Sequence, residues 1–147
     1  MPIRKAELSD IETILWARRN EPQLRLEEEP EEVVQVRLEK NISENRGCCL
    51  VDEEDGNVSA FIYAKHLESY GSKWAEIDYL YVDPSYRRRC IGNELYKKCE
   101  AELKGNGYTR IIFLTHHDNK VIKFMARQFG FELLETRGYI EFYGKNL

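Results

Sequence analysis

The segment from residue 80 to residue 93 constrains this chain most, because a strand, a basic loop and a helix follow one another directly. The run 74–82 predicts a strand that Asp83-Pro84 ends. Apolar residues spaced by four predict a helix near 91–104, and the arginine triplet 87–89 precedes it. The first N–H groups of a helix are free to bind an anion, and its dipole favours negative charge there. This junction therefore predicts a pyrophosphate site. A solvated surface turn is the alternative for an arginine triplet alone.

The rest of the pattern places this junction in a mixed α/β sheet. The turn Asp55-Gly56-Asn57 between two apolar runs predicts a β-hairpin. The expected strands cover 3–6, 48–51, 58–65, 74–82, 108–115, 131–137 and 139–144. The expected helices follow residues 10 and 30 and cover about 91–104 and 119–129. The order β-α-α-β-β-β-α-β-α-β-β predicts a mixed, mostly antiparallel central sheet flanked by helices, in a single domain over residues 1–147.

Charge and hydropathy exclude several classes of protein. The net charge of -4 argues against nucleic acid as the main partner, because non-specific phosphate binding requires a basic surface. The arginine triplet also lacks the interleaved aromatic residues of a single-strand binding module. No apolar run is long enough to span a membrane, and the first residues show no apolar signal region. We therefore expect a cytoplasmic protein without a membrane partner.

The cysteine and histidine spacing predicts no metal site. The four cysteines form no C-x-x-C pair. His116 and His117 are neighbours on an expected strand, so their side chains should point to opposite faces and not share a metal ion.

Two motifs in this sequence resemble those of the GNAT superfamily of acyl-CoA-dependent N-acyltransferases. That family carries Q/R-x-x-G-x-G/A at a strand-to-helix junction after a D-P-x-Y-R loop, and the matching residues are Arg87, Cys90 and Gly92. Downstream, Asn119 followed by the run 129–131 (Phe-Gly-Phe) is similar to the family helix that starts with Asn and ends in G-F. The element order extends the resemblance over nearly the whole chain. The resemblance implies acetyl-CoA as cosubstrate and an amine as acceptor.

The resemblance also implies roles for individual residues. Backbone groups of Leu80, Tyr81 and Val82 would pair with the pantetheine arm near a splay in the sheet. Asn119 would hydrogen-bond near the pantetheine, a role compatible with that of a helix N-cap. The residues expected to hold the pyrophosphate are Arg87, Arg88, Arg89, Cys90, Ile91, Gly92 and Asn93.

The chain departs from the family pattern at two positions. Cys90 replaces the first signature glycine, which is favoured where backbone approaches a ligand closely. We expect this small side chain to be tolerated with ordinary helical angles. Ala126 stands where the family often has a tyrosine that protonates the leaving thiolate, so that route is excluded. A thiol with a pKa of about 8.5 can leave without a dedicated acid.

An acetyl acceptor must attack as a neutral amine, which requires a base. A lysine-like amine with a pKa of about 10.4 is mostly protonated at neutral pH, and a placed carboxylate can take its proton. Strand 74–82 offers Glu76 and Asp78, whose side chains share a face. We expect both to point the same way as Leu80 and Val82.

The run 74–77, Trp-Ala-Glu-Ile, is similar to the segment that carries the general base in the histone-acetyltransferase branch of the family. Glu76 is therefore the first candidate for the base and Asp78 the second. A solvated or ion-paired edge residue is the alternative for both.

The acceptor stays open, although the acidic run 27–32 favours a cationic small molecule or peptide. Acidic residues that merely suit a helix N-terminus are the alternative. Two functions remain: direct acetyl transfer to a primary amine, or non-catalytic binding of acetyl-CoA by a regulator. A homodimer is one alternative for the oligomeric state.

Overall fold

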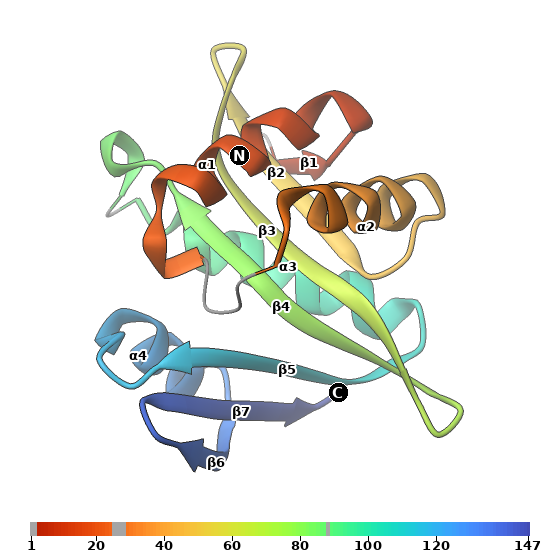
Figure 1. The fold of residues 1–147 in the computed structure, drawn as a ribbon, viewed down its shortest axis with the longest axis vertical. Coiled ribbons are helices and arrows are strands. Elements are labelled where there is room, and N and C mark those ends of the chain that lie inside the picture. Colours follow the sequence, from red (N-terminus) through yellow and green to blue (C-terminus); the bar gives the residue numbers. More distant parts are fainter. Residues whose placement is uncertain (1–2, 25–28, 88) are drawn as a thin grey trace.

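The structure is a computed structural model that describes residues 3–24, 29–87 and 89–147. Within these ranges the chain forms one seven-stranded sheet with four α-helices (Figure 1). The strands are β1 (Ile3–Lys5), β2 (Cys48–Glu54), β3 (Asn57–Ser69), β4 (Ser72–Val82), β5 (Tyr108–His116), β6 (Glu132–Arg137) and β7 (Ile140–Asn146). The helices are α1 (Ile11–Asn20), α2 (Glu31–Ser43), α3 (Ile91–Gly105) and α4 (Lys120–Gln128). The predicted element order is confirmed.

The sheet is mixed, as the sequence predicts. Its strand order is β1-β2-β3-β4-β5-β7-β6, and the described ladders are antiparallel apart from the parallel pair β4–β5. The hairpin turn at Asp55-Gly56 has φ values of 51° and 79°, as a two-residue type I′ turn requires. Tyr70-Gly71, with φ values of 50° and 81°, makes a second such turn between β3 and β4 that the sequence analysis did not predict.

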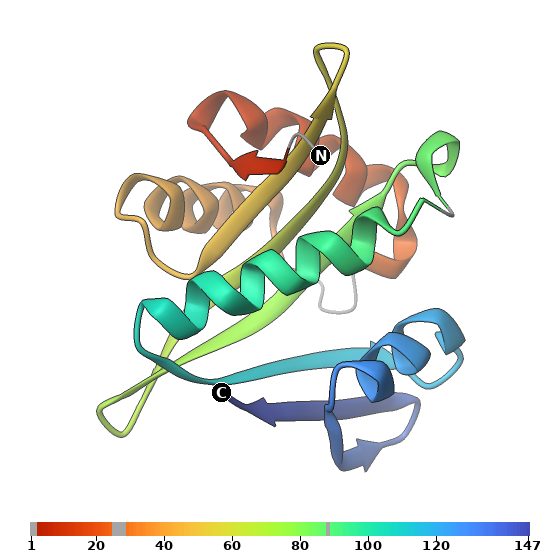
Figure 2. The same ribbon diagram turned by 180° about the vertical axis from the view of Figure 1, so that it is seen from behind.

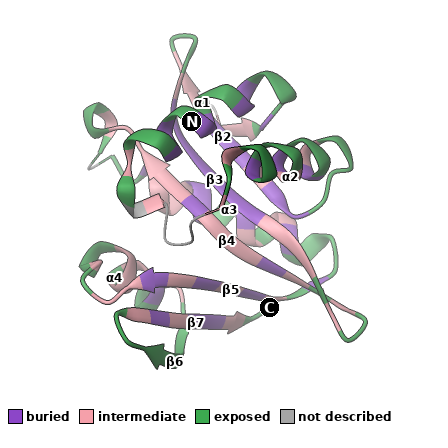
Figure 3. Cartoon of the chain, viewed as in Figure 1, coloured by how far each residue is buried: buried purple, intermediate pink, exposed green. Residues whose placement is uncertain are grey.

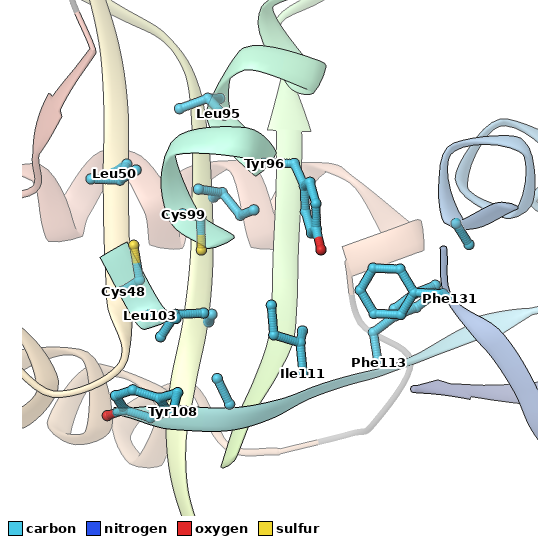
Figure 4. Packing of buried hydrophobic residues seen from close by; sticks show 14 of the residues in the cluster. Cys48, Leu50, Leu95, Tyr96, Cys99, Leu103, Tyr108, Ile111, Phe113 and Phe131 are labelled. Atoms are coloured by element: carbon cyan, nitrogen blue, oxygen red, sulfur yellow. The ribbon is translucent and has the colours of Figure 1, made fainter. Parts of the chain in front are cut away.

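A different pair of helices covers each face of the sheet. In Figure 1, α1 and α2 lie in front of the strands up to β4, while Figure 2 shows α3 and α4 on the opposite face. Buried residues follow the same division, since purple segments run along the central strands and the outer turns of the helices are green (Figure 3). The two faces carry separate hydrophobic clusters. We call the one that includes Leu95 and Leu103 of α3 the α3-side cluster, and the one that includes Ile14 of α1 and Leu38 of α2 the α1/α2-side cluster. In Figure 4, Leu95, Cys99 and Leu103 follow one another along α3, and Leu103 lies near Tyr108 of β5.

None of the described helices combines the length and the apolar character that crossing a bilayer requires.

Candidate active site

The strands β4 and β5 diverge after a short parallel ladder. Their register runs from Lys73↔Tyr108 to Glu76↔Ile112, and the described residues form no ladder pair beyond it. β4 continues to Val82 and β5 to His116, and the two ribbons separate in Figure 1. We call residues 77–82 of β4 and 113–116 of β5 the open edges. Unpaired strand edges present backbone N–H and C=O groups that can bind an extended ligand. The predicted Leu80, Tyr81 and Val82 lie on one of them.

A β-bulge at Asp78 changes which residues of β4 share a face. Tyr63 pairs with Tyr79 while Ala64 pairs with Ile77, so Asp78 is an extra residue on β4. Leu80 and Val82 pack in the α3-side cluster together with Ile77. Glu76 and Asp78 instead contact Lys65 of β3, and Asp78 also contacts Arg37 of α2. The expectation that both carboxylates point the same way as Leu80 and Val82 is therefore wrong, because the bulge reverses the alternation between Ile77 and Tyr79.

The N-terminus of α3 lies just past the end of β4 and is not capped by a side chain among the described residues. Cys90 at this position has φ 58° and ψ 20°, the left-handed conformation. The expectation of ordinary helical angles is wrong, because the chain must turn sharply here to enter the helix. This conformation disfavours a residue with a Cβ and favours glycine. The strain explains why the family signature has glycine here.

The basic loop before α3 folds back on its own surroundings. The Nε of Arg87 donates to the carbonyl of Val82 at 2.9 Å, and the Arg89 guanidinium lies 5.2 Å from the centre of the Tyr86 ring. Arg88 lies outside the described residues. Both described arginines are exposed, so they can add charge beside the free N–H groups of α3.

The first turn of α3 sits between β4 and α4. Ile91 is buried and anchors the helix, whereas Asn93 is half-buried. A Cβ added to Gly92 would lie 3.7 Å from Cγ2 of Val82 and 3.9 Å from Cε of Met125 in α4. These are ordinary contacts, so the protein itself does not require glycine at position 92. The small residue keeps the helix end clear for a ligand, and the predicted residues of this turn fit an anion site.

Asn119 caps α4, as predicted. Its Oδ1 accepts a hydrogen bond from the N–H of Ile122 at 3.2 Å. The cap fixes the start of α4 directly after β5, beside one of the open edges. At Ala126 the helix carries a buried methyl group in the α3-side cluster, without a hydroxyl to give to a thiolate.

The two candidate bases form one ionic cluster. Lys65 Nζ lies 3.6 Å from Oε2 of Glu76 and 3.4 Å from Oδ1 of Asp78. Arg37 Nη1 lies 3.6 Å from the other carboxylate oxygen of Asp78. Burial raises the pKa of Asp78 to about 7; the ammonium of Lys65 opposes this rise, and the neighbouring Glu76 adds to it. A carboxyl group with that pKa exchanges its proton at neutral pH, as a general base must.

The acidic run before α2 is partly engaged in ion pairs. Glu27 and Glu28 lie outside the described residues. Glu29 pairs with Arg37, and Glu31 pairs with Arg19 at 2.6 Å. The attraction of this run for a cationic acceptor therefore stays a prediction.

His116 and His117 lie closer together than the sequence analysis expected. His116 ends β5 and His117 follows it, so strand alternation no longer separates them. Their rings meet edge to face at 4.7 Å between centroids, and their ligand atoms lie within 4.8 Å of one another and of Asp118. The expectation that they point to opposite faces is wrong, because the strand ends between them.

Residues 8–131 match the sequence model of the Acetyltransferase (GNAT) family. The chain belongs to this family. Similar solved structures include the PaiA N-acetyltransferase from Thermoplasma acidophilum in complex with coenzyme A, at 22% identity and a TM-score of 0.80 over 99% of this chain and 98% of that one. A ribosomal-protein-alanine N-acetyltransferase from Brucella melitensis has 19% identity and a TM-score of 0.80 over 100% of both chains. YncA, a putative acetyltransferase from Salmonella typhimurium with acetyl-CoA, has 16% identity and a TM-score of 0.77 over 98% of this chain and 92% of that one.

Membership of the GNAT family confirms the resemblance read from the two motifs, and it confirms acetyl-CoA as the cosubstrate. At these sequence identities the likeness to the solved structures concerns the fold. The fold prediction, a mixed and mostly antiparallel sheet flanked by helices, is confirmed as well.

The sequence analysis missed two residues of the ionic cluster around Glu76 and Asp78, namely Lys65 and Arg37. Lys65 follows Phe61 and Tyr63 at two-residue spacing on β3, and these two pack in the α1/α2-side cluster. A lysine at an inward-facing strand position was the available signal. Arg37 stands beside the buried Leu38 on α2, and no sequence pattern distinguishes it from a solvated helix residue.

Proposed function

We propose that this GNAT protein is an N-acetyltransferase that transfers the acetyl group of acetyl-CoA directly to a primary amine of a small molecule or protein, within one domain over residues 1–147. Glu76 is the proposed general base, with Asp78 second. The observation that carries this proposal is the position of the two carboxylates, at the last β4–β5 pair and at the bulge directly after it. A thioester held at the start of the open edges would lie beside them.

The cosubstrate would bind along β4 and at the start of α3. The backbone of Leu80, Tyr81 and Val82 would pair with the pantetheine arm, and Asn119 would stand at its other side. The free N–H groups of the α3 N-terminus, with the arginine triplet 87–89, would hold the pyrophosphate.

The reaction needs two proton transfers and one bond exchange. The carboxylate takes a proton from the ammonium form of the acceptor, and the resulting neutral nitrogen attacks the thioester carbonyl carbon. A C–N bond forms, the C–S bond breaks, and the electron pair leaves on sulfur. The second proton of the nitrogen passes through water to the thiolate or to solvent. Ala126 leaves α4 without a hydroxyl for this last step, which a thiol of ordinary pKa does not require.

The test is acetyl transfer by the purified protein to a panel of amines and peptides, followed as release of free thiol from acetyl-CoA. Glu76→Gln keeps the shape of the side chain but cannot accept a proton. We expect its kcat at pH 7 to fall by about 10²–10⁴-fold, the usual contribution of a general base. The thermal shift produced by acetyl-CoA should hardly change, because the carboxylate does not hold the cosubstrate.

Glu68→Gln is the matched control, since Glu68 lies on β3 with its side chain 74% exposed, beyond the carboxylate cluster. It should keep the wild-type kcat. An unchanged kcat in Glu76→Gln would pass the role to Asp78 or to water. Acetyl-CoA binding without transfer to any acceptor would favour a binding regulator, a function that Ala126 and the strained Cys90 leave open.

A further inference from the structure

Lys65 occupies an unusual place for a lysine. Its side chain is only 12% exposed and extends from β3 across the sheet face that α1 and α2 cover. Its ammonium lies between two carboxylates of the neighbouring strand, at 3.6 Å from Glu76 and 3.4 Å from Asp78. Burying a lysine is unfavourable unless its charge is compensated. This compensation comes from the two residues proposed to act on the acceptor amine.

Groups from every neighbouring element surround Asp78. Tyr63 contributes a fully buried hydroxyl without a hydrogen-bond partner among the described residues. Burial raises the pKa of this hydroxyl, and the charge of Asp78 adds to the rise. The guanidinium of Arg18 of α1 donates its hydrogen bonds elsewhere, to the Tyr79 hydroxyl and to the Glu29 carbonyl. The titratable and charged groups facing this region are Cys49 from β2, Tyr63 and Lys65 from β3, Glu76 and Tyr79 from β4, Arg18 from α1, Glu29 from the segment before α2, and Arg37 from α2.

Two of these groups are cations close to Asp78, and they are not equivalent. Arg37 makes its primary contact with Glu29, through both guanidinium nitrogens, and reaches Asp78 at 3.6 Å. Lys65 has ion pairs only with Glu76 and Asp78 among the described residues. Without Lys65, the carboxylates of Glu76 and Asp78 would lie on one face of the sheet with the guanidinium of Arg37 as their one nearby cation in the described part of the chain, and that guanidinium also pairs with Glu29. Like charges placed so close favour the binding of a proton by one of them.

We propose that Lys65 is a positioning residue for acetyl transfer: its ammonium bridges Glu76 and Asp78 and weakens the hold of the pair on a proton, so that at neutral pH a carboxylate is available to deprotonate the acceptor amine. This inference rests on the proposed function, because it assigns a task to the carboxylates. It adds a residue of β3 to the two candidate bases, which the sequence analysis placed on β4.

Loss of the Lys65 ammonium should raise the pKa of the carboxylate pair. An opposite charge within about 4–6 Å lowers the pKa of a carboxyl group by about 1–3 pH units. Without the ammonium, the pKa of Asp78 should rise from about 7 by a similar amount. The pair of carboxylates would then hold a proton at pH 7 and would be fully deprotonated only in alkaline solution.

The experiment compares wild type, Lys65→Met and Lys65→Arg by two measurements. The first is the titration of the Asp78 side-chain carboxyl carbon by NMR in the ligand-free protein, with the resonance assigned from Asp78→Asn. Lys65→Met should raise this pKa by at least one pH unit, and Lys65→Arg should keep it close to the wild-type value. The second is the pH profile of kcat/KM, whose acidic limb should move upward by the same amount. Activity at pH 7 should fall about fivefold or more, because the deprotonated fraction drops from about one half to about one eleventh for a rise of one pH unit, and it should recover at high pH.

Lys73→Met is the matched control. Lys73 is an exposed lysine on β4, and its Nζ donates to the carbonyl of Asn106 on the α3 side of the sheet. It should leave both measurements unchanged. Should Lys65→Met fail to fold, Lys65→Gln carries the test with an uncharged side chain that can still form hydrogen bonds.

The outcomes separate the two proposals. An Asp78 pKa that is the same in wild type and Lys65→Met overturns the role of Lys65, whether or not the protein is active. A wild-type protein that acetylates no amine overturns the proposed function, while the NMR titration still decides what Lys65 does to the carboxylates. Lower activity in Lys65→Met with an unshifted pH profile would indicate a structural role only and would also overturn the inference.

Discussion

The two halves of β4 are held by different neighbours. Residues 73–76 lie between β3 and β5 and pair with both, whereas residues 77–82 have β3 as their one neighbouring strand in the described structure. The bulge at Asp78 lies just past the boundary between them. The paired half supplies rigidity, and the open half presents a backbone edge. The proposed site therefore lies where β4 and β5 separate, and its two carboxylates lie at the end of their ladder.

The largest expected effect is a difference in amide hydrogen exchange between the two halves of β4 when acetyl-CoA binds. Acetyl-CoA should slow amide hydrogen exchange in residues 77–82 and in the first turn of α3, because these amides would be covered by the cosubstrate. At a ligand concentration of about one hundred times Kd, amides whose exchange requires ligand release should slow by up to about 100-fold.

Residues 73–76 should show little change in the same exchange measurement, since they already pair with both β3 and β5. Mass spectrometry of peptides from each half makes the comparison. Equal protection of the two halves would contradict binding along the open edge.

The second expected effect is a loss of stability when the contact between α1 and the open half of β4 is removed. The Nε of the buried Arg18 donates to the Tyr79 hydroxyl at 3.1 Å. Tyr79→Phe should lower the free energy of unfolding by about 1–3 kcal/mol, because a buried guanidinium loses one acceptor.

Urea denaturation measures this loss, with Tyr81→Phe as the control. The Tyr81 hydroxyl has no hydrogen-bond partner among the described side chains, and its ring packs on Phe61 at 5.4 Å. Its replacement should change stability by less than about 0.5 kcal/mol. Equal effects of the two substitutions would show that Arg18 does not support β4 through Tyr79.

The smallest expected effect lies where the open half leads into α3. Cys90→Gly removes a Cβ from a residue with φ 58° and should raise the free energy of unfolding by about 0.5–1 kcal/mol. Acetyl-CoA affinity should be retained or improve, because the helix N-terminus keeps its shape.

Lys98→Gly is the control within α3 and should lower the free energy of unfolding. Lys98 is exposed within α3, where glycine costs about 1 kcal/mol. Thermal and urea unfolding of both variants decide the point, and destabilisation by Cys90→Gly would contradict the conformation of the loop.

Much of the architecture follows from local sequence signals. Apolar spacing of four residues in α3, the Asp55-Gly56 turn and Asp83-Pro84 after β4 each act over a few neighbouring residues, so they predict elements without knowledge of their partners. The junction between β4 and α3 is local in the same sense. For that reason it predicted both the position of the strand-to-helix junction and the family before any strand was paired.

The tertiary structure decided the features that depend on pairing between distant segments. The bulge at Asp78 arises from the register of β4 against β3, which alternation along β4 alone does not contain. The left-handed conformation of Cys90 follows from the angle at which the chain leaves the sheet and enters α3. Lys65 meets Glu76 and Asp78 only after β3 folds against β4, because strand pairing joins residues that chain order keeps apart. The sequence by itself thus determined which elements form and where the junction lies, and the sheet register decided which charges face one another.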